Sequence, residues 1–352
     1  GLGDVYKRQI IFWPDGWLYI SIFAILPFIL FIWLVKRHNF WFHRKDFLKK
    51  KIVINEQELR AIQYDFSDFD GGKEYIDPGH LYTFDLDIFG EHSLFQYINR
   101  TSTPVGKEHL AEWFNAHLEN KEAIEQRQEA IRELSTDLEY RQQIRLSGLL
   151  YKGKPADTSE IKEWANSPSY YRKHRLLRMI PATVSVINLL CISLTCLDIL
   201  PASIAGGVFA CFVVFSSVFS KGITKLQATY GKKLQILSTY ADQILLTEKK
   251  DMHSPVLQEL KAELTSRNQT ASQAVRRLSK LMNALDQRNN LLISMLLNGL
   301  IFWELRQVMK IEQWKEVHAS DLPRWIETVG EIDAYCSLAT FAYNHPEYIL
   351  SL

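Results

Sequence analysis

The chain of 352 residues has only four cysteines and almost no net charge. Three of the cysteines, Cys191, Cys196 and Cys211, lie in apolar stretches. Four are too few for a disulfide framework, and this setting is typical of small buried residues in a reducing compartment. The 41 basic and 40 acidic residues leave a formal charge of +1, which excludes a global attraction to nucleic acid or to an acidic partner.

The sequence also lacks the short motifs of common catalytic sites. Its Gly-Lys pairs begin at positions 72, 106, 153 and 231, and none has the following Ser or Thr and the preceding Gly of a phosphate-binding loop. HExxH, CxxC and GxSxG are absent as well. We therefore predict no catalytic residue, no cofactor site and no metal site in this chain.

Two acidic groups need a choice between metal binding and turn formation. Asp68-Phe69-Asp70-Gly71 with Asp77 matches part of a calcium loop, but Phe66 occupies the first ligand position. A solvated turn in which Gly71 and Gly72 supply positive φ fits this stretch better. Capping and turn chemistry is likewise favoured over a metal site for a second group, which contains His80, Asp85, Asp87 and His92.

Three long stretches carry no charged residue, and they are residues 16–35, 179–197 and 199–219. A helix needs about 20 apolar residues to cross ~30 Å of hydrocarbon. We predict a transmembrane helix within residues 10–40 and a transmembrane hairpin within residues 176–221, with its turn at Asp198 to Pro201. The alternative is a hairpin buried in a large soluble core.

Basic residues follow the first stretch and lie at both open ends of the hairpin, whereas the turn at residues 198–201 has none. This distribution indicates the orientation in the membrane. The basic residues are Lys36, Arg37, Arg44, Lys45, Lys49, Lys50 and Lys51 after the first stretch, and Arg172, Lys173, Arg175, Arg178, Lys221, Lys225, Lys232 and Lys233 around the hairpin. Such clusters stay in the cytoplasm. We expect a multi-pass protein of the inner (cytoplasmic) membrane, in contact with the lipid bilayer, with its bulk in the cytoplasm.

The first nine residues call for separate treatment. Residues 4–9, Asp-Val-Tyr-Lys-Arg-Gln, are a direct translation of the transposon-end adapter AGATGTGTATAAGAGACAG read from its second base. We expect residues 1–9 to be library sequence and the natural chain to continue upstream, and we exclude them from the reasoning on the fold.

The two polar blocks, residues 41–175 and 222–352, show helical periodicity, so the fold class is mainly α. Apolar residues from Leu257 to Leu292 alternate in steps of three and four, which predicts one long helix with a coiled-coil-like seam. Its basic residues are candidates for contacts with DNA phosphates, although a solvated helix face is the commoner role. They are Arg267, Arg276, Arg277, Lys280 and Arg288.

Three segments in order resemble the core of the MutS family of mismatch-repair ATPases. They are residues 92–114, with an Arg-Thr-x-Thr-x-x-Gly pattern, residues 124–134 and residues 331–342. The motif residues are Ser93, Leu94, Arg100, Thr101, Thr103, Gly106, Leu110, Trp113, Asp333, Ser337 and Ala339. Physically, Arg100 can anchor a helix end, the threonines can cap, Gly106 allows close approach, and Leu110 and Trp113 pack inward.

The resemblance implies a MutS-like helical core, with residues 222–352 as a lever that leads to an ATPase domain beyond Tyr348. That domain would hold ATP and Mg, and the parent protein would be an ATPase and a homodimer. Double-stranded DNA or a membrane-proximal protein would be its partner. The hairpin indicates a membrane-bound branch without mismatch recognition. The alternatives are a non-enzymatic membrane scaffold that binds partners through a coiled coil and, with less support, a transporter.

Overall fold

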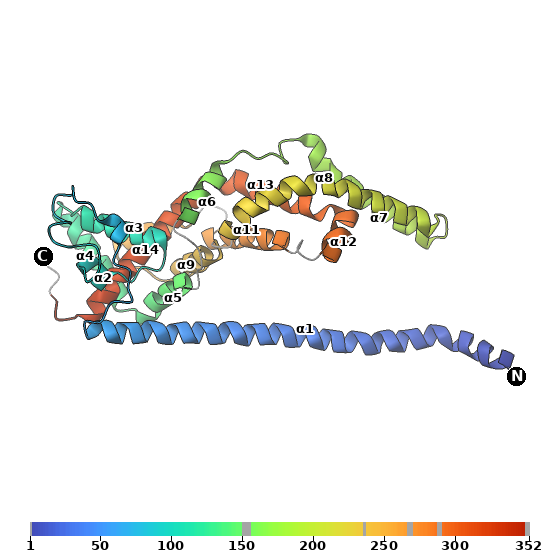
Figure 1. The fold of residues 1–352 in the computed structure, drawn as a ribbon, viewed down its shortest axis with the longest axis horizontal. Helices are drawn as coiled ribbons and strands as arrows, with labels where there is room; N and C mark the ends of the chain where they lie inside the picture. Colours follow the sequence, from blue (N-terminus) through green and yellow to red (C-terminus); the bar gives the residue numbers. More distant parts are fainter. Residues whose placement is uncertain (1, 150–155, 235–236, 266–269, 287–290, 349–352) are drawn as a thin grey trace. The chain divides into compact units, whose positions relative to one another are not determined.

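The computed structural model describes residues 2–149, 156–234, 237–265, 270–286 and 291–348 (Figure 1). Side chains are described for fewer of them, and those of residues 2–26 and 224–234 are outside the description. Within these ranges the secondary structure is helical, and the one β-type pairing is an isolated bridge between Thr265 and Thr270. The mainly α fold predicted from periodicity is confirmed.

The chain divides into two compact units, residues 1–56 and 57–352. Helix α1 spans Leu2–Ile62. Its residues up to Glu56 form the first unit, and its last residues, 57–62, belong to the second unit. Most side chains of the first predicted membrane stretch, residues 16–35, lie outside the described residues. Its described part, from Ile29 to Val35, exposes its large apolar side chains.

The second unit contains the remaining helices. They are η1 Lys73–Tyr75, α2 Leu94–Ile98, α3 Pro104–Asn115, α4 Lys121–Ser135, α5 Leu138–Leu149, α6 Ala156–Asn166, α7 Arg175–Cys196, α8 Ala202–Leu234, α9 Leu237–Lys249, α10 Pro255–Glu263, α11 Ala271–Asp286, α12 Leu291–Ile301, α13 Trp303–His318 and α14 Asp321–Asn344. Local chemistry sets several of the starts. Ser93, Thr103 and Asn120 each accept a backbone N–H in the first turn of the helix that follows.

Helix α14 is the central element of this unit, and its side chains enter all three apolar clusters. Trp325 joins the cluster around α9, α11 and α13, Tyr335 the cluster of α4, α5 and α10, and Ala334 the cluster of α2 and α3. All three side chains are buried. Burial of a large apolar side chain contributes about 1.5–3 kcal/mol to the free energy of unfolding. Helix α14 therefore stabilises the fold by packing against helices from both halves of the sequence.

The predicted long helix from Leu257 to Leu292 is wrong as one element. Its apolar seam is divided among three helices, α10, α11 and α12. The buried seam residues of α10 and α11 pack on different neighbours. The chain turns after Leu264, whose carbonyl accepts the N–H of Ala271. A run of Thr, Ser, Arg, Asn and Gln separates the helices, and most of these residues have weak helix propensity.

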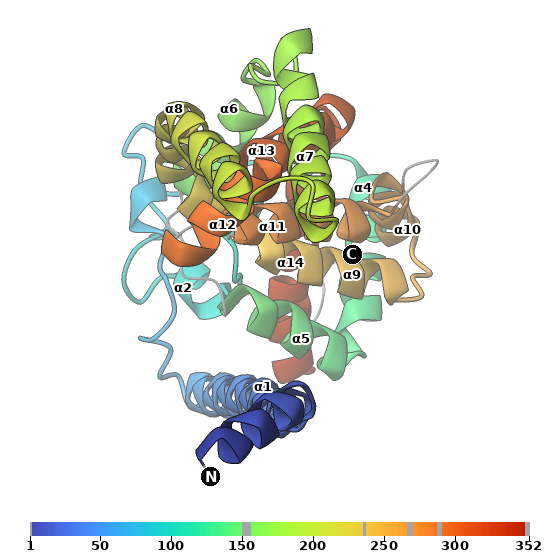
Figure 2. The ribbon, with the colours of Figure 1, turned by 90° about the vertical axis from the view of Figure 1, so that its right-hand side faces the viewer.

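The predicted hairpin consists of α7 and the first half of α8. Among the described residues, two helical segments are long and apolar enough to cross a membrane, Arg175–Cys196 and Ala202–Phe219, with mean hydropathies of 1.9 and 2.1. Helix α8 then continues into the body of the unit (Figure 1). Helix α12 packs on both arms, as Figure 2 shows. On α12, Met295 and Leu296 are exposed.

Candidate functional site: the junction of residues 99–103 with helix α14

The carboxylate of Asp333, on α14, holds the loop that precedes α3. The backbone N–H groups of Ser102 and Thr103 each donate to Oδ2 at 2.8 Å. The Ser102 hydroxyl donates to Oδ1 at 3.0 Å, and the Thr103 hydroxyl to Oδ2 at 2.8 Å. Thr103 Oγ1 in turn accepts the N–H of Gly106 at 3.0 Å and so caps α3. Burial raises the pKa of Asp333, and these hydrogen bonds partly offset that effect.

Ser337, one helical turn further along α14, binds the same loop through two hydrogen bonds. It accepts the N–H of Arg100 at 2.7 Å and donates to the carbonyl of Ile98 at 2.9 Å. The loop also stabilises itself, because Asn99 Oδ1 accepts the hydroxyl of Thr101 at 2.6 Å. Residues 98–103 are therefore hydrogen-bonded to α14 at two successive turns.

The guanidinium group of Arg100 extends the junction to residues earlier in the chain. Its Nε donates to both carboxylate oxygens of Glu58, at 2.8 and 3.0 Å, and Nη1 donates to the carbonyls of Tyr97 and Asn99. Arg145, from α5, pairs with the same carboxylate. Both Arg100 and Glu58 are nearly buried, with side chains 4% and 14% exposed, a setting in which loss of one partner leaves an uncompensated charge.

The ring of Phe69 lies beside both arginines. The centre of the Arg100 guanidinium is 3.6 Å from the ring centroid and that of Arg145 is 5.2 Å away. These are cation–π distances. Asn344, at the end of α14, donates to Glu58 at 2.9 Å. The two arginines, Glu58, Phe69 and Asn344 thus connect α5, the last turn of α1 and the end of α14.

Two glycines allow the close approach that this junction requires. A Cβ atom on Gly106 would lie 2.5 Å from Oδ2 of Asp333, and one on Gly148 would lie 2.1 Å from Oγ of Ser102. A side chain larger than hydrogen would therefore push α3 away from α14, or α5 away from the loop.

The remaining motif residues lie around this junction. Leu110 and Ala339 are fully buried, whereas Trp113 is half-buried between Tyr335 and the guanidinium of Arg127. Ser93 caps α2. Leu94 is the exception, since its side chain is 44% exposed and takes no part in the core.

The sequence reasoning missed several residues of the junction. Glu58 and Phe69 precede the motif in the chain, and Gln243 of α9 donates to both Ser102 Oγ and the carbonyl of Ile144. An isolated Glu at the end of a helix or a Gln within one has no distinctive neighbours in the sequence. The signal for them exists only in three dimensions.

A second ionic group joins α3, α6 and α14. Glu327 accepts a hydrogen bond from Nε2 of His109 at 3.1 Å and pairs with Lys162. The hydrogen bond and charge of Glu327 raise the pKa of His109, and Glu331 and Glu112 act in the same direction. The His109 hydrogen bond, with Lys162, lowers the pKa of Glu327 to about 2.

The sequence analysis also did not predict that side chains of α13 bind residues 167–172, the segment that leads into the hairpin. The carboxylate of Glu312 accepts three consecutive backbone N–H groups, those of Tyr170, Tyr171 and Arg172, at 2.8, 3.0 and 2.5 Å. Lys315, one turn further, donates to the carbonyl and the hydroxyl of Ser167.

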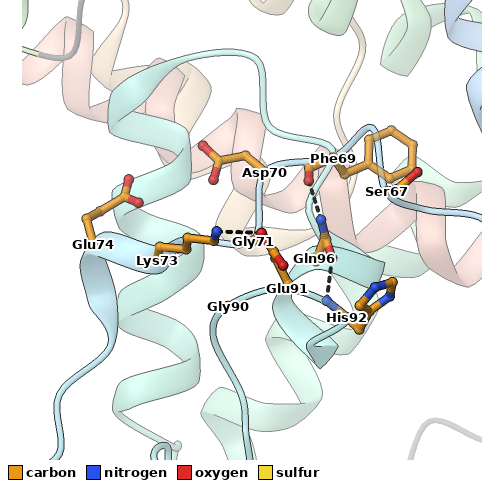
Figure 3. A pocket seen from close by; sticks show the side chains of 10 residues that line it. All are labelled: Ser67, Phe69, Asp70, Gly71, Lys73, Glu74, Gly90, Glu91, His92 and Gln96. Atoms are coloured by element: carbon orange, nitrogen blue, oxygen red, sulfur yellow. Dashed lines mark hydrogen bonds and ion pairs between the residues drawn. The ribbon is translucent and has the colours of Figure 1, made fainter.

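A polar cavity of about 510 Å³ lies next to the junction (Figure 3). Its acidic groups are engaged by lysines: Glu91 pairs with Lys73, and Asp70 pairs with Lys107. Asp70 also accepts the N–H of Gly72. In the described part of the chain, no three His, Cys, Asp or Glu side chains are grouped to hold a metal ion.

The turn chemistry predicted for this region is partly wrong. Gly72 has a φ of 65°, but the second glycine with positive φ is Gly90 instead of Gly71. Gly71 is required for a different reason, because a Cβ there would lie 2.0 Å from the carbonyl oxygen of Gly90. His80 closes the next turn, and its Nδ1 accepts the N–H groups of Tyr82 and Thr83.

Three of the basic residues proposed for DNA contact lie on α11. Arg276, Arg277 and Lys280 are exposed, and Arg276 pairs with Asp242 of α9 at 2.9 Å. Arg267 and Arg288 lie outside the described residues. The opposite face of α11 carries the buried seam, which includes Ala274 and Leu278.

The fold and the junction define a helical core whose first and last parts are joined by buried polar contacts. The family model for MutS domain III matches residues 81–339, which contain the loop, the hairpin and most of α14. The chain belongs to the MutS family. No curated protein and no solved structure gives a significant match to it.

Replacement of Asp333 by alanine removes the acceptor of four hydrogen bonds and leaves buried donors unpaired. We expect Asp333→Ala to lower the free energy of unfolding by about 3 kcal/mol, measured by chemical denaturation in detergent. Asp85→Ala, in an exposed turn, is the control. A change below ~1 kcal/mol would show that the junction does not carry the stability assigned to it.

Gly106→Ala tests the close approach separately from the charge. Alanine favours a helix over glycine by about 1 kcal/mol, so a destabilised Gly106→Ala variant reports the clash with Asp333. Gly207→Ala is the matched control, because a Cβ at this helical glycine meets no atom within 4 Å. We expect the melting temperature to fall for the first variant and to stay or rise for the second. Equal behaviour would contradict the predicted clash.

The His109–Glu327 pair predicts a pH dependence of stability. The folded-state pKa of His109 is raised above its usual 6.5, so its contribution is complete below pH 6.5 and is lost as the pH rises through the folded-state value. We expect melting temperatures to decline from pH 6 to pH 8.5 more in the wild type than in His109→Gln. Parallel curves would exclude this pair as the source.

Proposed function

We propose that this chain is the core and lever of a membrane-attached, MutS-like DNA-binding protein, in which the junction couples an ATPase domain to a DNA surface. The observation that carries the proposal is the binding of loop 98–103 by Asp333 and Ser337 on α14. A displacement of α14 along its axis would be passed directly to α3, because the two are joined at successive turns. Coupling over distance requires a packed element with two arrangements that both sites can bias, and the junction is proposed as that element.

The ATPase domain is proposed to follow the end of α14. The segment after this helix is held to the junction, since the Tyr97 hydroxyl lies 2.9 Å from Nε2 of His345 and Tyr348 stacks on His345. ATP and Mg would be bound in that domain, and the parent would be a homodimeric ATPase as the family resemblance implies. The gene downstream of Leu352 provides the test: a Gly-x-x-x-x-Gly-Lys-Ser/Thr sequence supports coupling, and a stop codon defeats it.

The DNA surface is proposed on the exposed face of α11. Arg277 and Lys280 project from it, and family membership supports a role in DNA binding. Because phosphate contacts release counterions, each contact adds about −0.9 to the slope of log affinity against log salt concentration.

We expect the Arg277→Ala/Lys280→Ala variant to bind double-stranded DNA more weakly and with a salt slope smaller in magnitude by about 2. The control removes two exposed charges elsewhere, Lys121→Ala/Arg132→Ala on α4. Fluorescence anisotropy with a labelled duplex at several salt concentrations measures both. An unchanged slope would exclude α11 as the DNA surface, and no DNA binding by the wild type would favour the membrane scaffold.

A coiled-coil scaffold has less support, because its seam is already occupied. Leu257, Leu260, Ala274 and Leu278 are buried within the unit, so they offer no free face to a partner helix.

Attachment to the cytoplasmic face of the inner membrane is proposed through the hairpin. Many of its apolar side chains are exposed in the described part, and none of the most apolar window of α8 is buried. The exposed residues Lys173, Arg175 and Arg178 precede this surface. Apolar area beside cations fits a lipid surface with anionic headgroups.

A further inference from the structure

The packing around the hairpin limits how far it can enter a membrane. By length, α7 could span a bilayer, since its 22 residues rise about 33 Å at 1.5 Å per residue. However, its first half is attached to polar helices. Nη2 of Arg306, on α13, donates to the Pro181 carbonyl and to the Ser185 hydroxyl, both at 2.7 Å.

Helix α11 reaches the same level along the hairpin. Nε1 of Trp303, at the start of α13, donates to the carbonyl of Ala284 at 3.4 Å. Lys280, one turn earlier on α11, is exposed. If the hydrocarbon began near Met179, the exposed polar face of α11 and the start of α13 would have to enter it. Such burial of unpaired charge is strongly unfavourable.

Helix α12 marks a level slightly further along the hairpin. Nδ2 of Asn188 donates to the carbonyls of Gly299 and Leu300, at 3.0 and 3.1 Å. A Cβ on Gly299 would lie 2.4 Å from the ring of Phe209, so α12 also lies directly against α8. Figure 1 shows α7 and α8 lengthwise and α12 nearly end-on, and Figure 2 shows α12 from the side, so α12 runs across the hairpin.

An apolar helix that lies across the direction of insertion is suited to the plane of a membrane surface. This placement also accounts for the exposed Met295 and Leu296 of α12. Beyond α12 only the tip remains. Residues 189–196 and 202–209 each rise about 12 Å. The whole hydrocarbon layer is ~30 Å thick, and one leaflet is therefore about half of that.

We propose that the hairpin enters a single leaflet from the cytoplasmic side and does not cross the membrane, with α12 lying at the interface. This inference rests on the proposed membrane attachment. It replaces the transmembrane hairpin expected from run length alone, because protein contacts occupy the half of each apolar run that is farther from the tip.

The backbone N–H groups of the tip are hydrogen-bonded within the protein and do not require water. The N–H groups of Asp198, Ile199 and Leu200 donate to carbonyls of α7 at 3.1, 3.0 and 3.2 Å, as backbone surrounded by lipid requires. Leu197 and Ile199 are each 67% exposed. The carboxyl group of Asp198, the one charged residue of 179–219, opposes this placement, and the surrounding apolar side chains favour it.

Cys196, which is exposed beside the tip, supplies a natural probe. The full chain would carry Cys191→Ala and Cys211→Ala, and the same chain with Cys196→Ala would measure residual labelling of the buried Cys336. A membrane-impermeant maleimide is applied to intact cells, to inverted membrane vesicles and to detergent-solubilised membranes. Lys310→Cys in the Cys196→Ala chain, at an exposed position of α13, is the control for access from the cytoplasmic side.

We expect Cys196 to be labelled only in detergent, at least tenfold more than in either membrane preparation, and Lys310→Cys to be labelled in inverted vesicles. Labelling of Cys196 in intact cells would show that the hairpin crosses, which overturns the inference but leaves membrane attachment standing. Labelling in inverted vesicles without detergent would show that the tip lies in water, and both the inference and attachment through the hairpin would then fail.

Discussion

The carboxylate of Asp333 is the contact on which the rest of the core depends. It joins residues 230 positions apart in the sequence and places α3 against α14, which enters all three apolar clusters. Two backbone and two hydroxyl donors surround it, and burial raises its pKa. Such a group is costly to bury and more costly to leave half-satisfied. It therefore specifies one arrangement of loop and helix, whereas apolar packing alone would tolerate several.

This constraint explains why the motif residues between Arg100 and Gly106 are small or polar. Gly106 is required because α3 approaches Asp333 too closely for a Cβ, and Thr103 both binds Asp333 and caps α3. The Arg100–Glu58 pair then extends the same polar connection to α5 and to the end of α14. The loop of residues 98–103, which is not helical, therefore fixes the position of α3 relative to α14.

The sequence predicted the mainly helical class and the resemblance to the MutS family, because both depend on local pattern. The transmembrane placement of the hairpin stays a prediction. The sequence did not predict Glu58, Gln243 or Glu312, whose partners lie 42 to 286 residues away. The break between α10 and α11 was missed for another reason. The apolar spacing continues across it, and only the weak helix propensity of the intervening polar run distinguishes a turn from a helix.

Run length alone does not decide the membrane contact, because hydrophobicity does not say whether lipid or protein covers a surface. Pro181 and Asn188 lie in an uncharged run, yet they bind Arg306 and α12. The same contacts make the proposed insertion compatible with the family core. Glu312 and Lys315 hold the entry segment against α13, and α8 returns into the body as one continuous helix. A force on the hairpin therefore reaches α13 directly, and α13 packs with α11, the helix that carries the proposed DNA surface.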